Sequence, residues 1–140
     1  MNSSLALFKD NGIRSFSKVL IAIRPGRRNK RFIDVADKIC RHFGASLTLL
    51  NIVSESDSNQ KIKRTEKSSS ELISETKSKS VVKIIKSNSP VEAISEESAS
   101  YDLLILGTPE KDNWISVLFG AGEDRFVKKA ACSVLRLTIK

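Results

Sequence analysis

The sequence predicts a doubly wound α/β domain, in which helices cover both faces of a parallel sheet. Short apolar segments alternate along the chain with segments whose apolar residues recur at helical spacing. Several short segments are apolar almost without interruption, for example 18–23 (KVLIAI) and 102–107 (DLLILG). Such runs are typical of strands that are buried on both faces of a parallel sheet, and their alternation with helices favours right-handed crossovers.

The first half of the chain begins with a strand, a helix and a second strand. Residues 16–23 form an apolar run that ends before Pro25 and Gly26, which predicts a buried strand followed by a sharp turn. From Asn29 to Phe43 the apolar residues recur at helical spacing, and Gly44 is a natural end for that helix. Residues 45–53 (ASLTLLNIV) predict the second buried strand.

Residues 54–80 differ from the rest because serine and lysine dominate them. Their few apolar residues include Ile62 and Ile73, which are three helical turns apart and would lie on one face of a surface helix. The polar composition is equally consistent with a mobile loop over the first half of the segment. Both interpretations stay open at this point.

The second half of the chain predicts three strands and two helices. The strands are expected at 81–85, 102–106 and 133–138, and the helices at 90–100 and 121–131. Ser89, Pro90 and Glu92 predict the start of the first helix, with serine as N-cap, proline at the first position and glutamate closing a capping box.

Length and charge limit the classes of function. The 140 residues suit one domain, which we place at 17–140 after a tail or linker at 1–16. No apolar run approaches the roughly 20 residues needed to cross a bilayer. The net charge is +8, and its densest cluster has no interleaved aromatic residues, so we do not expect nucleic-acid binding. That cluster consists of Arg24, Arg27, Arg28, Lys30 and Arg31.

The sequence offers no catalytic or metal-binding constellation. Cys40 and Cys132 are far apart and each lies in an apolar pattern, which predicts buried thiols and an intracellular, reducing setting. His42 is expected at a helix end, and no serine stands in a Gly-x-Ser-x-Gly frame. We therefore expect neither catalysis nor a metal site.

The residues of interest lie where the strand order of such a sheet reverses. Ligands of doubly wound sheets bind there, beyond the carboxyl ends of the strands, which means the turn after Ile23 and the loop after Leu106. That loop runs from Gly107 to Gly120, where a helix begins, and this arrangement places backbone N–H groups around an anion. Glu110 in the loop opposes such binding, because it adds a negative charge.

Four segments together resemble the universal stress protein family. They are KVLIAI, LTLLNIV, SPVEAISEESASYDLLILGT and FVKKAACSVLRL, which follow the family's order and spacing over residues 17–138. The resemblance implies a five-stranded parallel sheet of order 3-2-1-4-5, of the adenine-nucleotide alpha-hydrolase-like type, with 54–80 as the variable region. It also implies a homodimer through the last strand, at Val134, Leu135, Arg136 and Leu137.

The resemblance also implies a nucleotide site, which departs from the family pattern in this chain. Many members bind ATP through Gly-x-x-Gly-x(9)-Gly-Ser/Thr, and the matching positions are Gly107, Glu110, Gly120 and Ala121. The family's aspartate after the first strand falls on Arg24. The residues of this degenerate nucleotide site are Ile23, Arg24, Pro25, Val53, Gly107, Thr108, Glu110, Gly120 and Ala121. No cofactor is firmly expected, and the candidate ligand is ATP or another adenine nucleotide.

Two functions follow from this resemblance. The first is a dimeric, non-catalytic regulatory or interaction module with weakened or lost ATP binding. It would act in the cytoplasm, in a stress response or beside a transporter at the cytoplasmic membrane face. The second is a sensor of ATP, AMP or a cyclic dinucleotide that uses the Gly107–Gly120 loop and the basic turn 24–31, with slow ATP hydrolysis at most. Arg24 and Glu110 are either an ion pair across the crevice or two unrelated surface charges.

Overall fold

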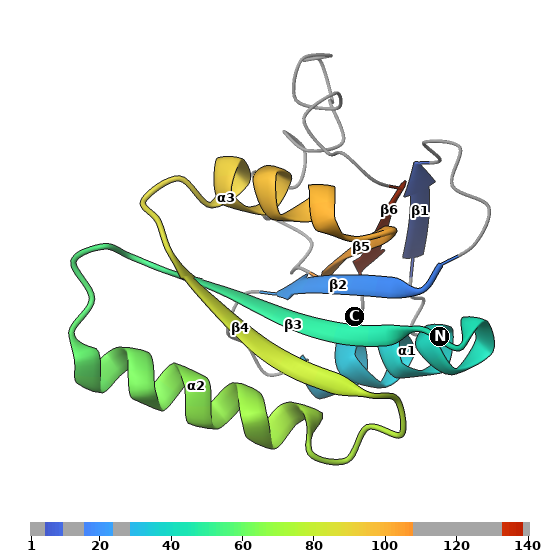
Figure 1. Ribbon diagram of the computed structural model, residues 1–140, viewed down its shortest axis with the longest axis horizontal. Coiled ribbons are helices and arrows are strands. Elements are labelled where there is room, and N and C mark those ends of the chain that lie inside the picture. The colour runs from blue at the N-terminus through green and yellow to red at the C-terminus, as the bar shows by residue number, and fades with distance from the viewer. Residues whose placement is uncertain (1–4, 10–15, 24–28, 108–132, 139–140) are drawn as a thin grey trace.

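The protein forms a six-stranded sheet with helices on both faces (Figure 1). The computed structural model describes residues 5–9, 16–23, 29–107 and 133–138. The described elements are β1 (Leu5–Lys9), β2 (Lys18–Ile23), α1 (Asn29–Phe43), β3 (Ser46–Val53), α2 (Asn59–Ile73), β4 (Ser80–Lys86), α3 (Pro90–Glu97), a 3₁₀ turn (Ser98–Ser100), β5 (Leu103–Gly107) and β6 (Ser133–Thr138). The expected helix at 121–131 lies outside the described residues.

The strands lie in the order β1-β6-β5-β2-β3-β4. From β2 to β6 every neighbouring pair is parallel, and these five strands have the predicted order 3-2-1-4-5. β1 is not one of these five parallel strands, because it pairs antiparallel with β6 at the end of the sheet. The helices α1 and α2 cover one face of the sheet and α3 covers the other (Figure 1). The predicted doubly wound α/β class is therefore confirmed.

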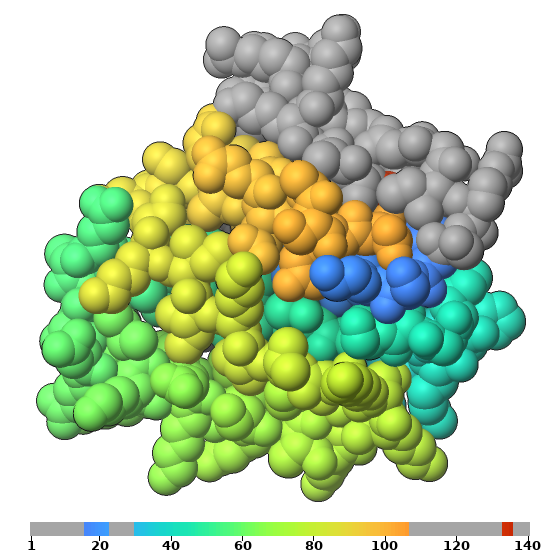
Figure 2. All heavy atoms as spheres, in the orientation of Figure 1, coloured from blue at the N-terminus to red at the C-terminus, as the bar shows by residue number. Residues whose placement is uncertain are grey.

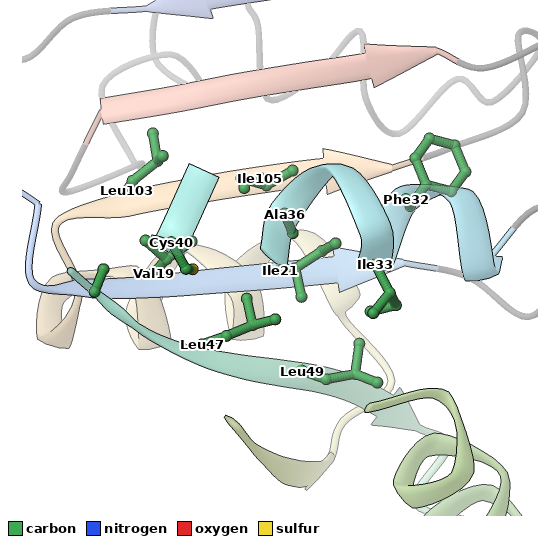
Figure 3. Packing of buried hydrophobic residues seen from close by; sticks show 11 residues of the cluster. Val19, Ile21, Phe32, Ile33, Ala36, Cys40, Leu47, Leu49, Leu103 and Ile105 are labelled. Carbon is green, nitrogen blue, oxygen red and sulfur yellow. The ribbon is translucent and has the colours of Figure 1, made fainter. Parts of the chain in front are cut away.

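Alternate residues of the central strands are buried in two separate clusters, one on each face. Val19, Leu47 and Ile105 point toward α1, where they meet Ile33 and Cys40 (Figure 3). The residues next to them point to the opposite face and form the second cluster. That cluster contains Leu20, Ala22, Leu50, Ile94, Leu104, Leu106 and Val134. Burial on both faces explains why these strands appear in the sequence as unbroken apolar runs.

The first helix ends where the sequence predicts. Gly44 follows α1 with φ +68°, the left-handed conformation that glycine adopts most easily. The Ala45 N–H then donates to the Cys40 carbonyl (2.8 Å), and β3 begins at Ser46.

Residues 59–73 form a surface helix, the first of the two interpretations left open for that segment. The Ser58 Oγ caps α2 by accepting from the Lys61 N–H (3.2 Å). Inside the molecule, the Asn51 Nδ2 donates to the buried Ser69 Oγ (2.6 Å). In Figure 2, α2 and β4 lie next to each other on the face toward the viewer. A thin buried stripe is thus enough to hold the helix on the sheet.

The structure differs from the sequence-based expectation in two local features. Residues 1–16 were expected to be a tail or linker, but Leu5–Lys9 form β1, because the edge of β6 offers unpaired backbone groups to a short apolar segment. Ser89 is the N-cap of α3, but its side chain makes no capping hydrogen bond. The Ser89 N–H donates to the Ser87 Oγ (3.0 Å).

Candidate functional site

The strand order reverses between β2 and β5. From β2 the chain continues through α1 to β3 on one side, whereas β5 is followed by β6 on the other. The two strands are parallel neighbours, and their last residues, Ile23 and Gly107, are partners in the register. The carboxyl ends of β2 and β5 therefore form the switch point at which doubly wound sheets bind ligands.

The structure brings together only part of the predicted nucleotide site. Ile23 and Gly107 lie side by side, and Val53 ends the next strand, β3, with 5% of its surface exposed. The Val53 carbonyl accepts from the Ser87 N–H (2.8 Å), which ties the end of β3 to the chain after β4. The other predicted residues lie outside the described residues: Arg24, Pro25, Thr108, Glu110, Gly120 and Ala121. The Arg24–Glu110 ion pair accordingly stays a prediction.

The first turn of α1, the helix that follows β2 in the chain, carries positive charge. It contains no acidic residue, and it carries Lys30 one position after the helix start. The Lys30 Nζ pairs with Asp34 (3.3 Å) and with Glu75 (3.1 Å), and the hydrogen bond to Glu75 is the main cause that raises the pKa of Lys30.

A hydrogen-bond network beyond β3 and β4 was missed by sequence reasoning. The Asn88 Oδ1 accepts from the Ser54 Oγ (2.9 Å) and from the Glu55 N–H (3.2 Å), and the Asn88 Nδ2 donates to Glu55 Oε2 (3.2 Å). The turn-forming sequence around Asn88 indicates a loop. The local sequence does not predict its hydrogen-bond partners, which lie more than thirty residues away in the chain. The network fixes the loop that follows Val53.

The expected dimer residues lie in β6, whose outer edge is occupied. Val134 is 1% exposed, and the register sets it opposite Lys9 of β1. Leu135, Arg136 and Leu137 are opposite Phe8, Leu7 and Ala6. In the described structure, the backbone edge at which the family resemblance places a second copy is thus paired with β1.

Two of the remaining candidate residues, Cys40 and His42, lie on α1. Cys40 is fully buried, and this burial, with Asp37 nearby, raises its pKa to about 12. His42 is exposed near the end of α1, edge-on to the Phe43 ring.

Within the described ranges, no three His, Cys, Asp or Glu side chains gather in a way that could hold a metal ion. No helix in the same ranges is long and apolar enough to span a membrane. Cys132 lies outside them.

Comparison with known proteins gives one family and one fold. The family model described as "Universal stress protein family" matches residues 15–137. No match is found among curated protein sequences. A universal stress protein from Archaeoglobus fulgidus in complex with dAMP is similar in structure, with 14% identity and a TM-score of 0.62, over 89% of this chain and 99% of that one.

Two further solved structures show the same fold. The universal stress protein UspA from Lactobacillus plantarum has 14% identity and a TM-score of 0.65, over 91% of this chain and 99% of its own. A universal stress protein in complex with cAMP has 15% identity and a TM-score of 0.63, over 88% and 97% of the two chains.

Proposed function

This chain belongs to the universal stress protein family, and on that premise we propose that it is a non-catalytic regulatory or interaction module with weakened ATP binding. The observation that carries the proposal is a contrast at the switch point. The backbone frame is present, since Ile23 and Gly107 are neighbours at the strand ends. The sequence at the matching family positions has nevertheless changed to Arg24, Glu110 and Ala121.

The charge of Glu110 supports weakened binding. Two unit negative charges about 5 Å apart repel by roughly 3 kcal/mol at an effective dielectric constant of about 20. That energy corresponds to a loss of about a hundredfold in affinity for a phosphate at that position. Glycine there would let the backbone approach the phosphate, whereas a glutamate side chain occupies the space.

Restoration of the family residues tests this proposal. Calorimetric titration with ATP–Mg²⁺ should give no binding at micromolar ligand for the natural chain, because a hundredfold loss moves the dissociation constant to about 0.1 mM. The triple variant Arg24→Asp, Glu110→Gly, Ala121→Ser should bind at about micromolar concentration. Glu96→Gln, which removes an exposed acid on α3, is the matched control and should not bind. Micromolar binding by the natural chain would refute the proposal, and an assay of ATP hydrolysis should show no turnover.

The second candidate function is a nucleotide sensor. It is favoured by the retained Gly107 beside Ile23, by the acid-free first turn of α1, and by the dAMP and cAMP complexes of proteins with this fold. In this case AMP or cyclic di-AMP should bind to the natural chain. Arg27→Ala with Arg28→Ala should then weaken that binding, whereas Lys63→Ala, an exposed site on α2, should not.

We further propose that the regulatory form is a homodimer through β6, acting in the cytoplasm in a stress response or beside a transporter at the membrane face. The family resemblance supports this assembly, and so does the position of β6 as the last of the five parallel strands. Such pairing requires the outer edge of β6 to be open.

A further inference from the structure

The backbone of β6 is paired along both of its edges. β5 occupies the inner edge through parallel pairing. β1 occupies the outer edge antiparallel, over the register from Lys9 opposite Val134 to Leu5 opposite Thr138. Because each edge of a strand hydrogen-bonds to one partner strand, the outer edge has no place for another chain while β1 is paired.

β1 also has the direction that a second copy would have. Two β6 strands that pair edge to edge about a two-fold axis perpendicular to them run antiparallel to each other. The β1 register covers residues 134–138, which include all the expected dimer residues. β1 therefore takes both the place and the orientation of a partner's β6 strand.

We propose that β1 is an intramolecular competitor of self-association: paired β1 keeps the protein monomeric, and its release exposes the β6 edge to a second copy. This inference rests on the proposed β6 dimer. Only residues 10–17 connect β1 to β2, and a short connection gives an effective concentration of about millimolar. If β1 is paired in about nine chains of ten, the apparent dissociation constant of the dimer rises about tenfold for each chain and about a hundredfold for the pair.

The position of β1 in the sheet makes its release compatible with the rest of the fold. Among the strands that the structure describes, β1 is terminal and β6 is its one neighbour. The described members of the two buried clusters include residues of β2, β3, β5 and β6 and of the helices that cover them. Strands held along one edge open at lower free energy than central strands. Loss of β1 should accordingly leave the domain folded.

Deletion of residues 1–9 is the direct test, with mass measured by light scattering over a range of protein concentrations. The full chain should have the mass of one copy, 15.5 kDa, and the truncated chain should have the mass of two. A synthetic peptide of residues 1–12, added in excess, should return the truncated chain to one copy. A peptide of the same composition in scrambled order is the control and should have no effect.

A second variant separates loss of pairing from loss of the segment. Neighbouring residues of a strand direct their N–H groups to opposite edges, so Ala6→Pro with Leu7→Pro removes whichever N–H faces β6. This double variant should dimerise like the truncated chain. Ser3→Pro with Ser4→Pro, which precede β1 in the sequence, is the matched control and should stay monomeric.

The outcomes distinguish the two proposals. If every chain is monomeric, both the β6 dimer and the competition are refuted. If the full chain dimerises as tightly as the truncated one, competition is refuted while the dimer stands. A dimeric full chain with a monomeric truncated chain would mean that β1 joins two copies, which also refutes competition. Hydrogen exchange tests the inference on the unmodified chain. The protection of the β6 amides should not change when the protein is diluted. Protection that disappears on dilution would overturn the inference.

Discussion

At the scale of single residues, carboxylates that accept backbone N–H groups connect distant segments. Asp102, just before β5, accepts from the Ser17 N–H (2.8 Å), the Ser17 Oγ (2.9 Å) and the Lys18 N–H (3.0 Å). The donation from the Ser17 N–H is the main cause that holds the pKa of Asp102 below its ordinary value. The carboxylate thereby joins the starts of β2 and β5, at the end of the sheet opposite the switch point.

This hydrogen bonding predicts a pH dependence of stability. Because the pKa of Asp102 is lower in the folded chain, its contribution is complete above the unfolded value of about 3.9 and is lost as pH falls through the folded value. Asp102→Asn should therefore flatten the dependence of the free energy of unfolding on pH below about 4. Urea titrations at several pH values measure this. Asp34→Asn, at an exposed ion pair, is the matched control variant; an unchanged slope in Asp102→Asn would contradict the argument.

The buried thiol gives a second prediction at this scale. Burial raises the pKa of Cys40 to about 12, and only the thiolate reacts with disulfide reagents. In a Cys132→Ser background, Cys40 should stay unlabelled by such a reagent at mildly alkaline pH until denaturant unfolds the chain. Rapid labelling of the folded chain would show that the thiol is accessible.

At the scale of elements, α1 is fastened at its end and at its middle. Gly44 ends it in the left-handed region. Asp37 is 7% exposed, and its carboxylate accepts from the Lys77 N–H (3.1 Å) and the Ser78 N–H (2.9 Å) beyond α2. Burial raises the pKa of Asp37, but donation from the Ser78 side chain and from these N–H groups outweighs it and lowers the pKa. The helix is thus joined to the chain that leads into β4.

Gly44→Ala should destabilise the chain by about 1–2 kcal/mol, the cost of left-handed backbone for a residue with a Cβ. The effect comes from conformation alone, because a Cβ at this position would meet nothing within 4 Å. Gly44→Asn is the matched variant and should cost less, since asparagine tolerates this region better. Thermal or urea unfolding measures both. Equal stability of the alanine variant and the natural chain would contradict this account.

Asp37→Ala should cost about 1–3 kcal/mol or more, because it leaves two backbone donors without their acceptor. Asp37→Asn should cost less, since its amide oxygen still accepts. Chemical unfolding compares the two with Asp34→Ala on the exposed side of the same helix. If Asp37→Ala behaves like Asp34→Ala, the connection to residues 77–78 contributes nothing to stability.

At the scale of the whole molecule, the sheet has a buried centre and two different edges. β2 and β5 lie at its centre, buried on both faces, whereas β4 is a terminal strand with Val81 54% exposed. Local opening is easiest where few apolar groups are buried. Amides of β2 and β5 should therefore exchange with solvent at the rate of global unfolding, and those of β4 faster. Hydrogen exchange followed by NMR measures this order; equal protection of β4 and β2 would contradict it.

The sequence by itself determined the elements whose apolar side chains are buried in the core. Runs such as 18–23 and 103–107 must be apolar on both sides because helices cover both faces of the sheet, so their pattern predicts parallel strands. The helix at 29–43 and its end at Gly44 follow from local periodicity and from one backbone conformation. The position of the switch point follows from the order of these elements.

Only the tertiary structure decided the features that join segments far apart in the chain. The segment Leu5–Lys9 is an isolated apolar patch in the sequence, and it becomes a strand because β6 offers an edge. The polar segment 59–73 is helical because Ser58 caps it and a thin stripe packs on the sheet. Asn88 finds its partners at Ser54 and Glu55 only after β3 and β4 have paired. These contacts depend on which surfaces the folded core leaves open, so the local sequence does not predict them.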